Sequence, residues 1–147
     1  MAYAAQNDII EIYGQQALYV ADRDGDGVAD TAAVDRALAS ASAEIDSYLV
    51  GRYMLPLHEV PAILRQLCVD IGIYRLALSA DVLTEEHRRR YEDATGHLRL
   101  IASGKAGLVF TTPVPVDPNA DPVLSAAQPI VHGGPPRLFS RDEMRDI

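Results

Sequence analysis

The distribution of proline divides this chain into two unlike parts. Seven of the nine prolines follow residue 112. A proline fixes its own φ and removes a backbone donor, so it interrupts helices and is excluded from the interior of sheets. The repeated prolines therefore predict that residues 108–147 form an extended C-terminal docking arm. Residues 1–107 contain only two prolines and are predicted to form a separate helical domain.

The body has the apolar spacing of helices rather than strands. Apolar side chains recur at steps of three and four, or cover most of the helix circumference, in the predicted main helices 31–50, 61–79 and 84–104. Residues 6–13 predict a shorter helix that ends at Gly14, followed by another turn or two over 15–21. We therefore predict an all-α fold, a small helical bundle with an extended proline-rich arm that ends in a short helix.

Composition excludes several functional classes. The chain has 147 residues, is 48% hydrophobic and carries a net charge of −8, with no apolar run near the ~18 residues of a membrane span. Strong acidity argues against wrapping nucleic acid or docking on anionic lipid, which both need a cationic face. The N-terminus lacks the pattern of a signal peptide. One cysteine, Cys68, excludes an internal disulfide, and its apolar helix predicts a buried, unreactive thiol.

An Asp-rich loop matches the first half of a calcium-binding loop. Carboxylates stand at relative positions 1, 3, 5 and 9, with a backbone carbonyl at position 7, which gives the ligand set Asp22, Asp24, Asp26, Val28 and Asp30. Position 12 should be a bidentate Glu but is Ala33. The alternative is an Asp/Gly turn whose acids cap the next helix. Apart from this candidate calcium site, no cofactor is expected.

The predicted arm contains two candidate partner-binding segments. Leu108, Val109 and Phe110 belong to a possible short strand over 108–112, which could add to a partner's sheet edge. Near the end of the sequence, a capping box of Ser140 and Glu143 and a hydrophobic staple of Phe139 and Met144 predict the start of a short helix. So short a helix needs a surface to dock on, and we expect these four residues and Arg137 to bind a partner.

Other candidate chemistry is sparse. The four histidines form no metal-ligand pair and are predicted to lie on the surface. Arg88, Arg89 and Arg90 form the main basic cluster, which is either a solvated face paired with nearby acids or a contact with an acidic partner. No nucleophile motif, phosphate loop or dinucleotide fingerprint is present, so an enzyme is not expected.

Five blocks in order resemble the head–tail joining proteins of Mu-like phages and prophages: residues 21–27, 41–57, 60–71, 88–93 and 136–144. The resemblance implies a virion protein, made in the host cytoplasm, that acts as a head-completion adaptor in the neck. It implies a ring beneath the portal, with roughly twelve copies if the ring follows portal symmetry. The implied partners are other copies, the portal protein and the next neck or tail protein, with no membrane.

The acidic composition fits a ring through which DNA passes without specific binding, because acids lining a lumen would repel phosphates. The resemblance carries no catalytic residues. Two other interpretations stay open at this point. Within the neck, the chain could be a stopper or a tail terminator. From another class, the Asp-rich loop could make it a calcium-dependent binding module, which a calcium requirement for partner binding would distinguish.

Overall fold

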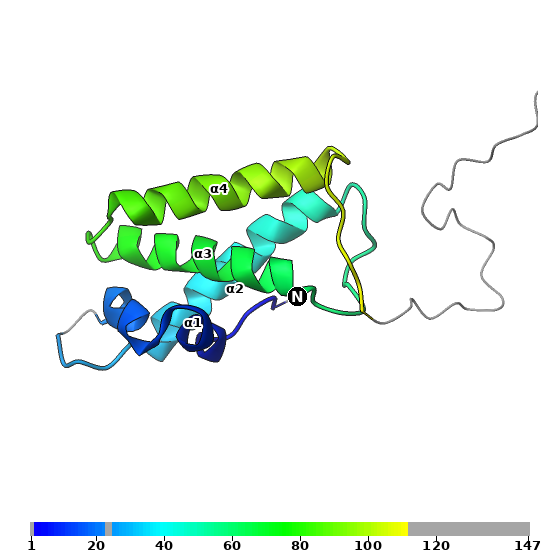
Figure 1. Cartoon of the computed structure of the whole chain (residues 1–147). Coiled ribbons are helices and arrows are strands. Elements are labelled where there is room, and N and C mark those ends of the chain that lie inside the picture. The colour runs from blue at the N-terminus through cyan, green and yellow to red at the C-terminus, as the bar shows by residue number, and fades with distance from the viewer. Residues whose placement is uncertain (1, 23–24, 112–147) are drawn as a thin grey trace, which may run out of the picture. The chain divides into compact units, whose positions relative to one another are not determined.

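The computed structural model describes residues 2–22 and 25–111. This part of the chain contains five helices and no strand (Figure 1). The helices are α1 (Gln6–Tyr13), the 3-10 helix η1 (Gln15–Ala21), α2 (Thr31–Leu49), α3 (Ala62–Ser79) and α4 (Glu85–Ala102). The all-α prediction is confirmed, and each predicted main helix ends within two residues of its observed bounds. The expected turns after Gly14 take the tighter 3-10 form.

Local signals fix the helix ends. Gly14 has φ of 81°, a left-handed value that an L side chain rarely adopts, and its N–H donates to Ile10 O. Thr84 caps α4 by accepting a hydrogen bond from the His87 backbone N–H. His87 Nδ1 accepts a bond from Thr84 N in return, which completes a capping box, and His87 is a buried residue with 9% exposure. The prediction that all histidines lie on the surface is therefore wrong for His87.

Helix α3 is the centre of the bundle. It packs against α1, η1, α2 and α4, as its nearly continuous apolar circumference predicts. The fully buried side chains come from every α-helix and include Ile9, Val34, Ile45, Leu64, Ile71 and Leu98. Cys68 is also fully buried, as predicted, and burial raises the pKa of its thiol. No helix in the described ranges is long and apolar enough to span a membrane.

A glycine sets the distance between α2 and α3. A Cβ at Gly72 would lie 2.8 Å from Leu38 Cδ2, closer than non-bonded carbons approach. Leu38 is itself 3% exposed. The absence of a side chain at position 72 therefore lets α2 approach α3 closely enough for Leu38 to fill the space.

Loops and turns gather at the two ends of the bundle (Figure 1). One end carries η1, the Asp-rich loop and the turn between α3 and α4. The other end carries the connector between α2 and α3 and the segment that follows α4. Because residues 112–147 lie outside the described part, the boundary between residues 107 and 108 stays a prediction.

Candidate interaction surfaces

The carboxylates of the Asp-rich loop bond to their own backbone. Asp22 accepts from the N–H groups of Gly25 at 2.8 Å and Gly27 at 3.0 Å. Asp26 accepts from Val28 N at 2.7 Å. Asp30, the ninth residue of the predicted calcium loop, accepts a hydrogen bond from Ala33 N at 3.3 Å and thereby caps α2. These bonds are the ones expected of an Asp/Gly turn, which was the alternative to a calcium-binding loop.

Calcium binding by this loop stays a prediction, since Asp24 lies outside the described residues. Within residues 2–22 and 25–111, no group of three or more His, Cys, Asp or Glu side chains is placed to hold a metal ion.

Because the amides of the Asp-rich loop already have carboxylate partners, we expect the loop to fold without a cation. Chelation by EDTA should leave Tm unchanged, and excess calcium should shift it by less than about 1 °C. A rise of several degrees would instead show preferential binding to the folded state.

The start of the predicted arm lies on the connector between α2 and α3. Leu108 N donates to Tyr53 Oη at 3.0 Å, and Thr111 N donates to a Glu59 carboxylate oxygen at 3.0 Å. The Phe110 ring lies 4.7 Å from the His58 ring, centre to centre. Residues 108–111 form no strand, so that expectation is wrong for them. A strand needs a partner edge, and here side chains take the backbone bonds instead. We call residues 108–111 the arm root.

The candidate arm residues fall into two groups. Val109 is 83% exposed, whereas Leu108 and Phe110 are half-buried against the body. The remaining candidates, Arg137, Phe139, Ser140, Glu143 and Met144, lie outside the described residues. Their partner-binding assignment stays a prediction.

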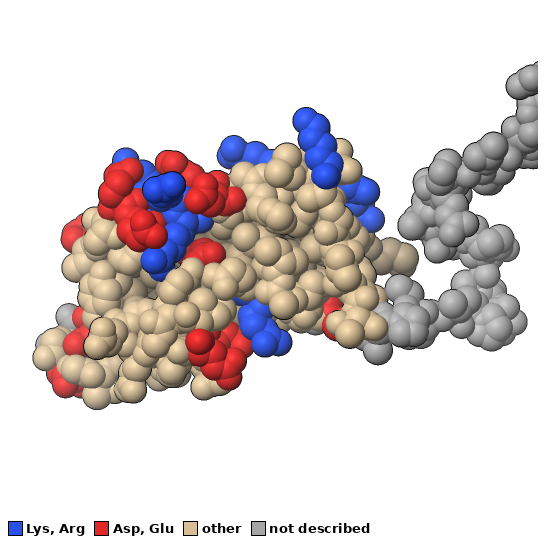
Figure 2. All heavy atoms as spheres, in the orientation of Figure 1, with Lys and Arg blue, Asp and Glu red and all other residues tan. Residues whose placement is uncertain are grey.

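The basic cluster on α4 separates into two kinds of side chain. Arg88 and Arg89 are exposed, and Figure 2 shows red and blue atoms mixed around this part of the helix. Arg90 pairs with Glu86 at 2.9 Å, and its guanidinium lies 4.5 Å from the centre of the Tyr13 ring. Only Arg88 and Arg89 are therefore free to serve as an outward-facing contact, and no observation identifies a partner for them.

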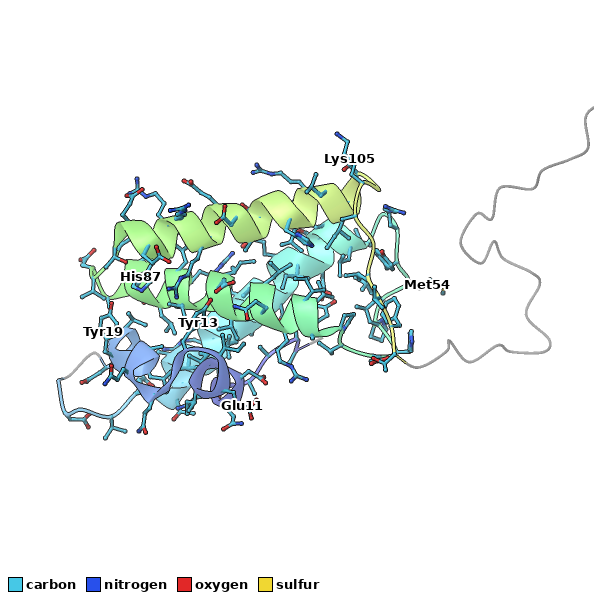
Figure 3. The ribbon with its side chains drawn as sticks, viewed as in Figure 1. Glu11, Tyr13, Tyr19, Met54, His87 and Lys105 are labelled. Atoms are coloured by element: carbon cyan, nitrogen blue, oxygen red, sulfur yellow. The ribbon has the colours of Figure 1, made fainter. Side chains whose placement is uncertain are left out.

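A polar network that the sequence analysis missed joins α1 to α3. Tyr13 Oη donates to Asp70 Oδ1 at 2.5 Å, and Gln66 Nε2 donates to Tyr13 Oη at 2.9 Å (Tyr13 is labelled in Figure 3). Burial is the largest cause that raises the pKa of Asp70, and it also raises the pKa of Tyr13 to about 12. The only sequence signal was Gln66 and Asp70, two polar residues four apart on a mainly apolar helix. The network fixes α1 on the bundle.

A second missed network joins α2, α3 and α4. The Glu44 carboxylate accepts from Arg75 Nη2 at 2.6 Å and from Tyr91 Oη at 3.1 Å. The Tyr91 ring stacks on Tyr74 with centres 4.2 Å apart. Arg75 Nη1 also donates to Ser40 Oγ. One carboxylate thus ties together three helices.

These observations describe a small helical module with fixed internal packing, charged outer surfaces and a segment after α4 that is held on the connector between α2 and α3. The chain belongs to the family described as Bacteriophage Mu, Gp36, whose model matches residues 3–126. It is 34% identical over 146 residues to gene product J of Escherichia phage Mu, with 97% of each chain covered. It is also 46% identical over 79 residues to the Mu-like prophage FluMu protein gp36 of Haemophilus influenzae, covering 54% of this chain and 55% of that protein. The chain is thus a Mu-like phage protein of the structural or morphogenetic kind.

Proposed function

We propose that this protein is a head–tail adaptor of a Mu-like virion, forming a ring beneath the portal and completing the neck for tail attachment. The observation that carries the proposal is the match over 97% of both chains to a protein of phage Mu. The proposed work is binding rather than catalysis. The rigid bundle forms the ring, and the arm contacts the portal or the next neck protein. Calcium and catalytic residues have no part in it.

The arm root supports this division of labour. Backbone bonds to Tyr53 and Glu59 hold residues 108–111 on the body, so the chain continues from a fixed point. If fully extended, residues 112–147 would span at most about 130 Å, enough to reach across a neighbouring subunit. The net charge of −8 per copy supports a lumen that repels DNA phosphates and lets DNA pass without specific contact.

The test replaces two predicted anchor side chains in the full-length protein. We expect the Phe139→Ala and Met144→Ala double variant to lose at least tenfold in joining portal-containing heads to tails, because both apolar contacts would be lost. Heads that lack this protein would be supplied with purified variant, followed by tails. Infectious titre and the number of copies bound per head would then be measured.

A matched control removes apolar side chains elsewhere in the arm, with Leu124→Ala and Val131→Ala, and should join heads as wild type does. Equal titres for the anchor variant and wild type would contradict the docking proposal. Recovery of the protein on purified tails rather than on heads would favour the tail-terminator alternative. Loss of joining in EDTA, restored by calcium, would favour the calcium-dependent alternative.

A further inference from the structure

The end of the bundle that carries the Asp-rich loop is acidic and partly apolar. We define the loop end as two segments, residues 19–31 without 23 and 24 and residues 79–85, which contain five carboxylates and no lysine or arginine. Among its described side chains, Tyr19 is 54% exposed, Val28 is 66% exposed and Val82 is 40% exposed. A hollow of about 310 Å³ lies between Tyr19, Asp22 and the turn at Asp81. The two segments therefore form one continuous surface.

The opposite end is basic and also partly apolar. We define the connector end as residues 50–61 and 99–111, which contain Arg52, Arg99, Lys105 and one acid, Glu59. Arg52 is held in place by a 3.0 Å bond from Nη1 to Ile101 O. The large exposed apolar side chains here are Val50, Met54, Leu100 and Val109, with Met54 exposed to 92%.

The two surfaces lie at opposite ends of the same rigid unit. Tyr19 is labelled at one end in Figure 3, and Met54 and Lys105 are labelled at the other. Figure 2 shows blue atoms without red neighbours at the C-terminal end of α4, whereas red and blue mix at its N-terminal end. The connector end is thus basic on this face, the described residues of the loop end are acidic in sum, and both ends carry exposed apolar side chains.

We propose that the loop end of one copy docks on the connector end of a second copy, in a head-to-tail contact. Opposite charges would face each other around an apolar centre, which favours this pairing and fixes its orientation. Pairing two loop ends or two connector ends would oppose like charges, so a symmetric dimer through either surface is disfavoured. A head-to-tail contact leaves both surfaces of the chain usable, and its repetition closes a ring or extends a filament. The proposal rests on the proposed function, for which it supplies the contact between subunits.

Lys105 makes the contact directly testable because it is the sole lysine of the chain. A carbodiimide joins an amine to a carboxylate only when the two groups touch. We would mix ¹⁵N-labelled and unlabelled full-length protein at high concentration and low ionic strength, add carbodiimide, and identify cross-linked peptides by mass spectrometry. We expect mixed-isotope links from Lys105 to Asp22, Asp26, Asp30 or Asp81. Lys105→Arg should abolish the links while preserving assembly.

Charge reversal tests orientation. One variant carries Arg99→Glu and Lys105→Glu, so both of its ends are acidic. The other carries Asp26→Lys, Val28→Lys, Asp81→Lys and Glu85→Lys, which changes the net charge of the loop end from −5 to +2. Each alone should lose at least tenfold in the assembled fraction, measured by light scattering after size exclusion. Mixing them should restore assembly, because each altered end then meets its opposite. Arg88→Glu with Arg89→Glu, a matched change of charge outside the connector end, should leave assembly unchanged.

The inference is overturned if Lys105 links only to its own chain or to carboxylates of the arm, or if mixing the reversed variants restores nothing. Absence of any link between chains overturns it as well. The proposed function fails separately. If the head-to-tail links form but the wild-type protein does not join heads to tails, the contact stands and the adaptor function does not. If joining is normal and both reversed variants join normally, the adaptor stands and this contact does not.

Discussion

Replacing Gly72 with leucine should lower the free energy of unfolding by about 3 kcal/mol or more, the largest effect expected from a single side chain in this bundle. Even a Cβ at this position would lie 2.8 Å from Leu38 Cδ2 and 3.7 Å from Leu38 Cγ. Leu38 is buried, so its side chain cannot move into solvent, and α2 and α3 would have to separate. Urea denaturation followed by circular dichroism would measure the change through the transition midpoint.

Two further variants distinguish this clash from a general effect of replacing glycine. A Cβ at Gly96 on α4 would meet no side chain and no other segment within 4 Å, beyond its chain neighbours and the backbone of its own helix. Gly96→Ala should therefore raise stability by about 0.5–1 kcal/mol, through the lower conformational entropy of the unfolded chain. Adding Leu38→Ala to Gly72→Leu should recover part of the loss, since it frees space at the same contact. A cost below about 0.5 kcal/mol for Gly72→Leu would show that α2 and α3 are not held at this distance.

Replacing Glu44 with alanine should lower the free energy of unfolding by about 2–3 kcal/mol. The Glu44 side chain is 16% exposed and accepts hydrogen bonds from both Arg75 and Tyr91. Without the carboxylate, Arg75 keeps its bond to Ser40 but loses its counter-charge. Arg75 Nε is already buried with no hydrogen-bond partner among the described residues, so the variant would leave the guanidinium poorly satisfied.

The matched control is Glu86→Ala, which removes the carboxylate of the Arg90 pair. That pair joins side chains four residues apart on α4, and the Glu86 side chain is 60% exposed. Exposed ion pairs of this kind contribute little, so the loss should stay below about 0.5 kcal/mol. Equal losses for the two variants would mean that the Glu44 network contributes no more than a surface pair. Thermal unfolding at fixed pH would compare them.

The sequence predicted the helices because their signals are local. Gly14 ends α1 and Thr84 begins α4 through contacts within a few residues, so the residues that carry each signal are neighbours in the sequence. The apolar circumference of α3 also predicted its central place, since burial on all sides requires neighbours on all sides. Helix bounds, fold class and a buried Cys68 could therefore be derived without the structure.

The failed strand at residues 108–111 and the missed polar network of Tyr13 depended on contacts distant in sequence. Residues 108–111 have strand-forming side chains, but strand formation needs a second edge that this all-α body does not provide, and Tyr53 and Glu59 took the amides instead. Tyr13 and Asp70 are 57 residues apart, so no local pattern could pair them. Asp30 shows a third limit. An acid before a helix serves equally as a cap or as a cation ligand, and residue type alone cannot separate the two.

The arm root is held on the body of the protein, so residues 112–147 are joined to the bundle at a fixed point. If residues 112–147 carry the proposed docking contacts, their attachment at Thr111 confines those contacts to a volume around the bundle set by the length of the chain, at a high effective concentration. Once one copy of the protein is held in place, a weak site within that volume is occupied without a second encounter from solution. Several copies held side by side would multiply this gain. Weak contacts of individual arms would then suffice for an attachment that no single arm could sustain.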